Sequence, residues 1–149
     1  MKDKPIIAVI DGQGGGVGRM LVEKLRARLK DRVEILALGT NVHATEQMLR
    51  SGADDGATGE NAIRYNAPRA KVIVGVVAIL AGNALLGELS PDMAAAISCS
   101  PAHKVLIPMN RCGIEVVGVQ SAPLPLMADK AVEAVERILE GDQGELISP

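Results

Sequence analysis

The stretch that decides the fold reads Ile6-Ile7-Ala8-Val9-Ile10-Asp11, followed by the glycine-rich turn Gly12-Gln13-Gly14-Gly15-Gly16-Val17-Gly18. Its first five residues are apolar and mostly β-branched, which is typical of a parallel strand covered on both faces. Residues 17–30, after the turn, repeat apolar side chains at helical spacing. A buried strand, a glycine-rich turn and a helix in this order predict the opening unit of an α/β domain with a ligand-binding loop.

The glycine-rich turn meets three physical demands of a phosphate site. Glycine adopts positive φ without strain, so the chain can turn tightly. The missing Cβ atoms let a phosphate approach the backbone, and free N–H groups at the helix start attract an anion. We therefore predict that a small-molecule nucleotide or another phosphorylated ligand binds at Asp11, Gly12, Gln13, Gly14, Gly15, Gly16, Val17 and Gly18. The alternative, a loop that only packs the helix against the strand, stays open.

The rest of the chain alternates strand and helix patterns. Apolar runs predict strands at residues 33–38, 71–79, 104–109 and 115–119, and the polar, glycine-rich residues 53–58 allow a short third strand. Helical spacing and capping residues predict helices at residues 43–51, from 58 or 59 to Pro68, from 91 to 98 and, after a turn at Pro123 and Pro125, at 127–139. Residues 110–114 are too few for a helical crossover, so the last two strands are expected to form an antiparallel hairpin.

These elements predict one domain over residues 1–149 with a three-layer, Rossmann-like α/β fold. The expected sheet is mostly parallel, has five to six strands, and carries helices on both faces. The apolar content of 48% fits such a domain, although the chain has one Tyr and neither Phe nor Trp. The core is therefore expected to consist of Val, Ile, Leu, Ala and Met.

Composition also excludes several classes of partner. The net charge is −2, and the chain has no run of Lys or Arg and no aromatic platform for bases, so nucleic acid is not expected to bind. The most apolar run, residues 72–86, is interrupted and falls short of the ~20 residues that a membrane span needs. The start of the chain lacks a signal-peptide layout, and its two cysteines do not form a disulfide framework. We expect a cytoplasmic protein.

The glycine spacing favours one kind of nucleotide loop. Gly12-x-x-x-Gly16-x-Gly18 is the pattern of the short-chain dehydrogenases and reductases, and residues 6–25 resemble their opening strand, turn and helix. This resemblance implies NADP or NAD as cofactor, with its pyrophosphate at these three glycines. Asp11 departs from the family, which usually has a small or hydroxyl residue there.

The resemblance does not extend to the catalytic residues of that family. Tyr65 and Arg69 have the spacing of its Tyr-x-x-x-Lys pair, but Pro68 breaks the helix that such a pair needs. Phosphoryl transfer is also disfavoured. The loop resembles that of the ParA-like ATPases, but Arg19 and Met20 stand where a lysine and a hydroxyl residue are required.

The end of the second predicted strand bears on the choice of cofactor. An NAD site usually has an acidic residue there for the ribose hydroxyls. This chain has Gly39-Thr40-Asn41 instead, so we expect Thr40 and Asn41 to contact the cofactor as neutral hydrogen-bonding groups. NADP, NAD and a simpler nucleotide all stay open.

Asp11 is expected at the carboxyl edge of the sheet, where it has two readings. It is either a ligand for a metal or substrate, or an acceptor for N–H groups of its own loop, and we favour the second. A structural zinc site is not expected, because Cys99, His103, His43 and Cys112 show no repeated ligand spacing.

Two further segments offer substrate-binding residues. Glu60 and Asn61 follow the short third strand, and Asn110 and Arg111 follow the fifth, so both pairs are expected at the ligand-binding edge. Arg111 can clamp a carboxylate or phosphate. Glu60 and Cys112 are the candidate catalytic residues, Cys112 as a nucleophile if a neighbouring charge lowers the pKa of its thiol. The alternatives are a helix-capping role for the first pair and a buried structural cysteine.

Three segments, IDGQGGGVG (10–18), GATGENAI (56–63) and LIPMNRCGIEVVGV (106–119), together resemble a small bacterial family of unknown function. That resemblance covers nearly the whole chain. It implies a one-domain cytosolic protein and supplies no activity.

Three functions therefore stay open. The first is a nucleotide-binding protein with an NAD(P)-type ligand. The second is a non-enzymatic sensor of a nucleotide or phosphorylated metabolite that reports through an oligomer contact. Residues 80–89 are the candidate contact of a homodimer, although core packing is the favoured role of this segment. The third is a small lyase or transferase that uses Cys112 or Glu60 on a phosphorylated substrate.

Overall fold

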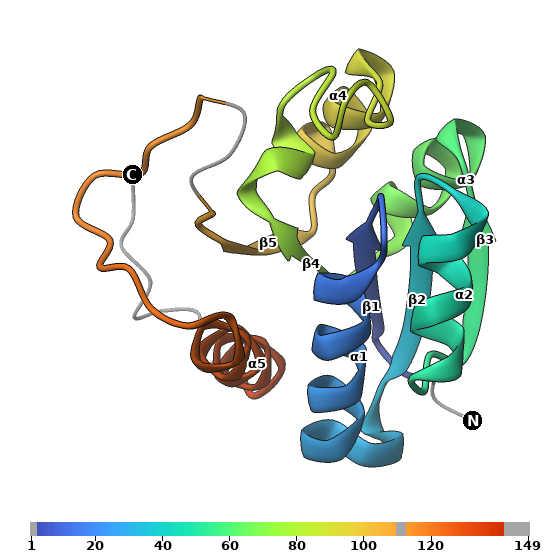
Figure 1. The fold of residues 1–149 in the computed structure, drawn as a ribbon. Coiled ribbons are helices and arrows are strands. Elements are labelled where there is room, and N and C mark those ends of the chain that lie inside the picture. The colour runs from blue at the N-terminus through green and yellow to red at the C-terminus, as the bar shows by residue number, and fades with distance from the viewer. Residues whose placement is uncertain (1–2, 110–112, 142–149) are drawn as a thin grey trace.

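The computed structural model describes residues 3–109 and 113–141 of the chain. Within them five strands form one parallel sheet in the order β3-β2-β1-β4-β5 (Figure 1). The strands are β1 (Ile6–Asp11), β2 (Glu34–Gly39), β3 (Asp55–Thr58), β4 (Val72–Val76) and β5 (His103–Ile107). The first strand thus lies in the middle of the sheet, with later strands added on both sides.

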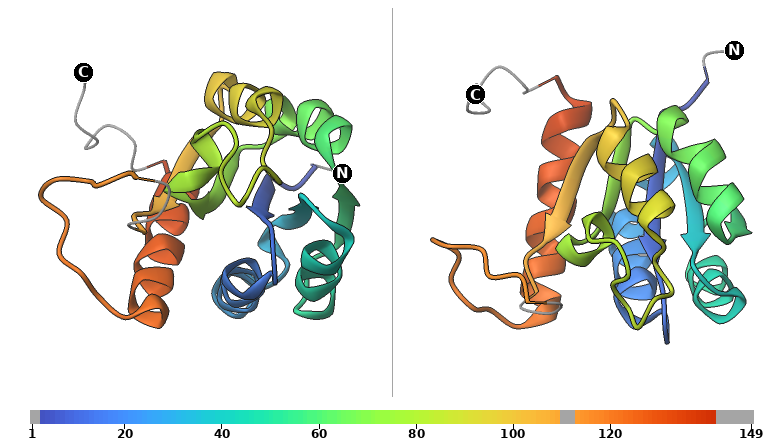
Figure 2. Two further views of the ribbon diagram at one scale, coloured as in Figure 1. Left: turned by 45° about the horizontal axis from the view of Figure 1, so that its top comes forward. Right: turned by 90° about the horizontal axis from the view of Figure 1, so that it is seen from above.

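Helices cover both faces of this sheet and make three layers (Figure 2). On one face, α1 packs against α2 and against α5, and on the other α3 packs against α4. These helices are α1 (Gly16–Leu29), α2 (Val42–Arg50), α3 (Glu60–Asn66), α4 (Pro91–Cys99) and α5 (Leu124–Leu139). Single 3₁₀ turns follow α1, α3 and β4, the last being η3 (Val77–Leu80). The three-layer Rossmann-like fold expected from the sequence is confirmed.

The core is aliphatic throughout. Residues 7–10 of β1 and 72–74 of β4 are almost completely buried, because helices cover both faces of the central strands. Their neighbours in the core are mainly Leu, Ile, Val, Ala and Met. Close packing depends on interdigitated volume rather than on rings, so the lack of aromatic residues does not prevent a dense interior. No helix of the described residues is long and apolar enough to span a bilayer.

Residues 115–119 do not form the sixth strand, so the predicted antiparallel hairpin is wrong. This segment belongs to no strand of the described sheet, contains Gly118 with a positive φ, and leaves Val117 93% exposed. Strand preference depends on packing against a half-buried sheet surface, which these valines lack here. The chain goes on to α5, which begins at Leu124 rather than at residue 127, because Pro125 is tolerated in a first helical turn.

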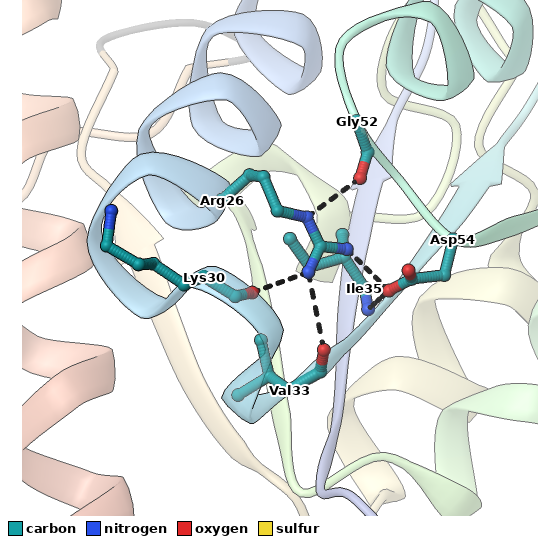
Figure 3. Close-up of polar contacts among 6 residues, drawn as sticks. All are labelled: Arg26, Lys30, Val33, Ile35, Gly52 and Asp54. Carbon is teal, nitrogen blue, oxygen red and sulfur yellow. Dashed lines mark hydrogen bonds and ion pairs between the residues drawn. The ribbon is translucent and has the colours of Figure 1, made fainter.

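Arg26 joins three elements near the amino ends of β2 and β3 (Figure 3). The glycine-rich turn lies at the carboxyl end of β1. The Arg26 guanidinium donates to the carbonyl oxygens of Gly52 at 3.1 Å and Lys30 at 2.6 Å, and to a carboxylate oxygen of Asp54 at 2.5 Å. That oxygen also accepts the N–H of Ile35 at 2.7 Å. Burial opposes the charged form of Asp54, but these two donors prevail and lower the pKa of its carboxyl. The cluster thus fixes the end of α1 against β2 and the turn before β3.

Candidate glycine-loop site

A cavity of about 360 Å³ lies at the carboxyl ends of β1 and β4. The sheet order reverses between these two strands, and ligands of such sheets bind at that switch point. The glycine-rich turn forms one wall. The whole lining comprises Asp11, Gly12, Gln13, Gly14, Gly15, Gly16, Val17, Arg19, Met20, Val76, Ala78, Leu85, Met109 and Leu124. The predicted loop therefore borders a cavity with a polar wall and an apolar wall.

The backbone of the glycine-rich turn leaves donors unused. The N–H of Gly15 donates to the carbonyl oxygen of Gly12 at 3.0 Å, and Gly15 itself has a φ of 75°. Helix α1 then begins without a side-chain cap. Across residues 3–109 and 113–141, no acceptor receives the N–H groups of Gly14, Gly16 or Val17. These groups and the helix dipole suit the site to an anion.

The glycines of the turn differ in whether the protein has room for a side chain at their position. A Cβ atom at Gly18 would lie 2.7 Å from Sδ of Met48 and 2.8 Å from Cβ of Asp11, so Gly18 permits close packing of α1 on β1. At Gly14 and Gly16 a Cβ atom would meet nothing within 4 Å, and neither residue has a positive φ. The fold itself thus requires no glycine at these two positions.

Asp11 is 7% exposed, and its carboxylate accepts the N–H of Gly18 at 2.7 Å. This hydrogen bond is the kind expected if the Asp11 carboxylate stabilises its own loop. Burial raises the pKa of Asp11, against the opposing effect of the hydrogen bonds from Gly18 and Gly12. Among the described residues, no three His, Cys, Asp or Glu side chains gather to hold a metal ion.

Glu88 is a site residue that the sequence did not reveal. Its Oε1 accepts three hydrogen bonds, from the N–H of Gln13 at 2.9 Å, Oγ1 of Thr40 at 2.7 Å and Nδ2 of Asn41 at 2.8 Å. These donors lower the pKa of Glu88, the Gln13 N–H most strongly. Glu88 lies 75 positions from Gln13, so no local pattern could connect the two. Its carboxylate lies beside the end of β2 but belongs to a different element.

The turn that carries Glu88 has an unusual backbone. Asn83, Leu85, Leu86 and Gly87 have φ values of 69°, 58°, 56° and 86°. Leu85 is strained in this left-handed conformation, and such strain persists only where surrounding contacts determine the conformation. Leu85 is held against the glycine-rich turn, since a Cβ atom at Gly12 would lie 2.8 Å from its Cδ1.

The other predicted residues lie apart from this cavity or beyond the described structure. Oγ of Ser90 donates to Oε1 of Glu60 at 2.5 Å, Asn61 is exposed, and neither Glu60 nor Asn61 lines the cavity. The predicted residues Asn110, Arg111 and Cys112 fall outside the described residues.

Arg19 is a second residue that sequence reasoning missed. In the sequence, Arg19 stands where the ATPase loop has a lysine. In the structure, Arg19 is one of the residues that line the cavity. Its nearest carboxylate is that of Glu23, at 3.8 Å on an exposed face of α1. A cation three residues into the helix is a signal for anion binding that the loop sequence did contain.

A larger cavity, of about 440 Å³, lies between β5 and α5. It is lined mostly by apolar side chains, with Lys130 as its one charged residue among those described. None of the predicted site residues that the structure describes borders it. The chemistry of the lining, rather than volume, therefore identifies the glycine-rich turn as the candidate site.

A parallel sheet in the order β3-β2-β1-β4-β5 with a glycine-rich turn at its switch point defines a Rossmann-like α/β protein. The chain belongs to the family "Domain of unknown function (DUF3842)", whose model matches residues 6–140. The resemblance of its three sequence segments to a family of unknown function is thereby confirmed.

Comparison with solved structures gives two distant similarities. The crystal structure of AibC is 17% identical, with a TM-score of 0.48, and the match covers 94% of this chain and 43% of AibC. A putative NADPH:quinone reductase from Bacillus thuringiensis is 15% identical, with a TM-score of 0.40, and the match covers 96% of this chain and 46% of the reductase. The chain spans less than half the length of either protein. Among curated proteins, none matches.

Proposed function

We propose that this chain binds a nucleotide, with a phosphate group on the N–H groups of Gly14, Gly16 and Val17. The observation that carries the proposal is the open space beside Gly14 and Gly16. No contact or backbone angle of the protein requires glycine there, whereas a phosphate that approaches the backbone does. The apolar wall, from Val76 and Ala78 to Leu124, would then face the base or another apolar part of the ligand.

Electrostatics support an anionic ligand at this end of the cavity. The start of α1 carries a partial positive charge, and Arg19 adds a full one beside it. At 3.8 Å and on an exposed face, the pair of Arg19 with Glu23 is weak, so the guanidinium can turn towards a phosphate. The glycine spacing makes NADP and NAD the first dinucleotides to test.

A second candidate function is ligand sensing without catalysis. Among the described lining residues, Asp11 and Arg19 are the ionisable ones, and Asp11 is engaged by Gly18. Neither is a ready proton-transfer group. A sensor would report through a homodimer that uses residues 80–89, where Leu86 is 97% exposed while Leu89 is buried. Sedimentation with and without nucleotide tests this function, which requires a ligand-dependent change of mass.

Calorimetric titration with NADP, NAD, AMP, ATP, GTP and coenzyme A tests nucleotide binding directly. At least one compound should bind the unmodified chain, and Gly16→Ala should weaken it at least tenfold, because the new methyl group lies where the phosphate would. Gly16→Ala should remain as stable as the parent, since its Cβ meets no protein atom.

A charge-matched pair of variants completes this test. Arg19→Gln should weaken binding, whereas Arg50→Gln should not. Both arginines are exposed and pair with a glutamate one turn away, but Arg50 lies at the far end of α2. Equal affinities for the parent, Gly16→Ala and Arg19→Gln, or the absence of any nucleotide binding, would overturn the proposal.

A further inference from the structure

The structure also bears on the size of the nucleotide, an inference that rests on the proposed function. A dinucleotide in a Rossmann-like sheet crosses the switch point, with one phosphate group at the start of the first helix and a ribose at the end of the second strand. In this chain that second position lies at Thr40 and Asn41, directly after β2. The question is whether the position is free.

The end of β2 is occupied by Glu88. Both side-chain donors there, Oγ1 of Thr40 and Nδ2 of Asn41, already donate to Glu88. The space over Gly12 is filled as well, since a Cβ atom there would lie 2.8 Å from Leu85 and 3.1 Å from Glu88. A ribose at this position would have to displace Glu88 before it could bond to Thr40 or Asn41.

The open space lies on the other side of the glycine-rich turn. None of Thr40, Asn41 and Glu88 borders the cavity, which extends instead towards β4, Met109 and the start of α5. Its volume of about 360 Å³ is near the lower end of the roughly 300–1,000 Å³ found for small-molecule sites. One nucleoside with its phosphate fits this description better than two.

We propose that the site takes a mononucleotide, and that Glu88 excludes the second nucleoside of a dinucleotide from the end of β2. The turn at residues 83–87 supports this role, because the left-handed Leu85 is held against the glycine-rich turn. The carboxylate also repels a 2′-phosphate. Affinity should therefore fall from a mononucleotide to NAD, and again from NAD to NADP.

The test compares AMP, GMP, FMN and nicotinamide mononucleotide with NAD and NADP by calorimetric titration. In the unmodified chain, the best mononucleotide should bind at least tenfold more tightly than either dinucleotide. Glu88→Ala should raise the affinity for NAD at least tenfold relative to the affinity for the best mononucleotide, because it frees the side chains of Thr40 and Asn41. Glu46→Ala, which removes an exposed carboxylate on α2, should change neither affinity.

The outcomes separate this inference from the proposed function. If NAD or NADP binds the unmodified chain as tightly as every mononucleotide, the inference is overturned while nucleotide binding stands. If no nucleotide binds either protein, both are overturned. Should circular dichroism show that Glu88→Ala does not fold, the comparison within the unmodified chain still decides, with Glu88→Gln as the second variant.

Discussion

The five glycines of the turn serve at least two purposes, which single substitutions can separate. Gly18 lies where α1 crosses β1, beside Met48 and Asp11, and a side chain there would overlap the core. Gly14 and Gly16 face open space. Packing thus requires glycine at position 18. At positions 14 and 16 the proposed ligand, rather than the protein, would require it.

Gly18→Ala should therefore destabilise the protein, while Gly16→Ala should not. The new Cβ would lie 2.7 Å from Sδ of Met48 and 2.8 Å from Cβ of Asp11, so packed side chains and α1 must shift. Overpacking of this kind costs about 1–3 kcal/mol. Urea denaturation of the two variants and the parent measures the difference. Equal stabilities for both variants would contradict the separate roles of these glycines.

Asp11 gives a prediction about charge. Its buried carboxylate has a raised pKa in the folded chain, so the folded state holds its proton more firmly than the unfolded state. This group's contribution to stability therefore falls as pH rises from the ordinary aspartate pKa through the raised one. Asp11→Asn should gain stability relative to the parent over that interval, which denaturation at a series of pH values measures.

The same variant tests the chemistry of the loop. A carboxylate beside a bound phosphate is repulsive, so Asp11→Asn should bind the phosphate of a nucleotide more tightly than the parent. The reading of Asp11 as a metal ligand makes the opposite prediction. Asp11→Asn would then bind the nucleotide more weakly, and a divalent cation would strengthen binding in the parent but not in the variant.

At the scale of elements, Arg26 ties α1, β2 and the turn before β3 together, far from the candidate site. Arg26→Met should lower the free energy of unfolding by about 1–2 kcal/mol, because charged hydrogen bonds are lost from a partly water-screened site. Nucleotide affinity should not change, since the cluster lies at the opposite edge of the sheet. A variant with lower affinity but parental stability would contradict this division between the two edges.

The cluster also predicts an acid dependence. The pKa of Asp54 is lowered in the folded chain, so its contribution is complete above the ordinary aspartate pKa. That contribution is lost as pH falls through the lowered value. Arg26→Met should make stability less sensitive to acid. The difference in the free energy of unfolding between parent and variant should therefore narrow at low pH.

Element prediction from sequence succeeded where the signal is local. Residues 6–10 are uniformly apolar and residues 127–139 have a clear helical period, and both segments lie in the elements expected. Residues 115–119 have equally good strand composition, but no neighbouring strand pairs with them. Pairing depends on the position of other segments, which composition does not contain.

At the scale of the whole molecule, the candidate site was only partly predictable for the same reason. The glycine-rich turn is contiguous in sequence and was found. Glu88 and the apolar wall at Val76 and Leu85 reach the turn through the sheet order, so only the folded chain reveals them. The predicted substrate residues Glu60 and Asn61 lie at the same edge of the sheet but outside the cavity.

Nucleotide binding should stabilise the entire domain. A ligand that binds only the folded state at 100 times its Kd adds about 2.7 kcal/mol to the free energy of unfolding. Thermal denaturation with increasing nucleotide should therefore show a rising midpoint in the parent and in Arg50→Gln. Arg19→Gln should show a smaller rise at the same concentrations, and an equal rise in all three proteins would speak against a role for Arg19.

The position of β1 in the centre of the sheet affects how the protein is made. On the ribosome, Glu88 emerges 75 residues after Gln13 of the glycine-rich turn. At translation rates of roughly 5–20 residues per second, the turn waits about 4–15 s for the residue that covers it. A nascent chain in this interval carries the glycine-rich turn without Glu88. The turn therefore completes its hydrogen bonds only after β2, β3 and β4 have all been synthesised.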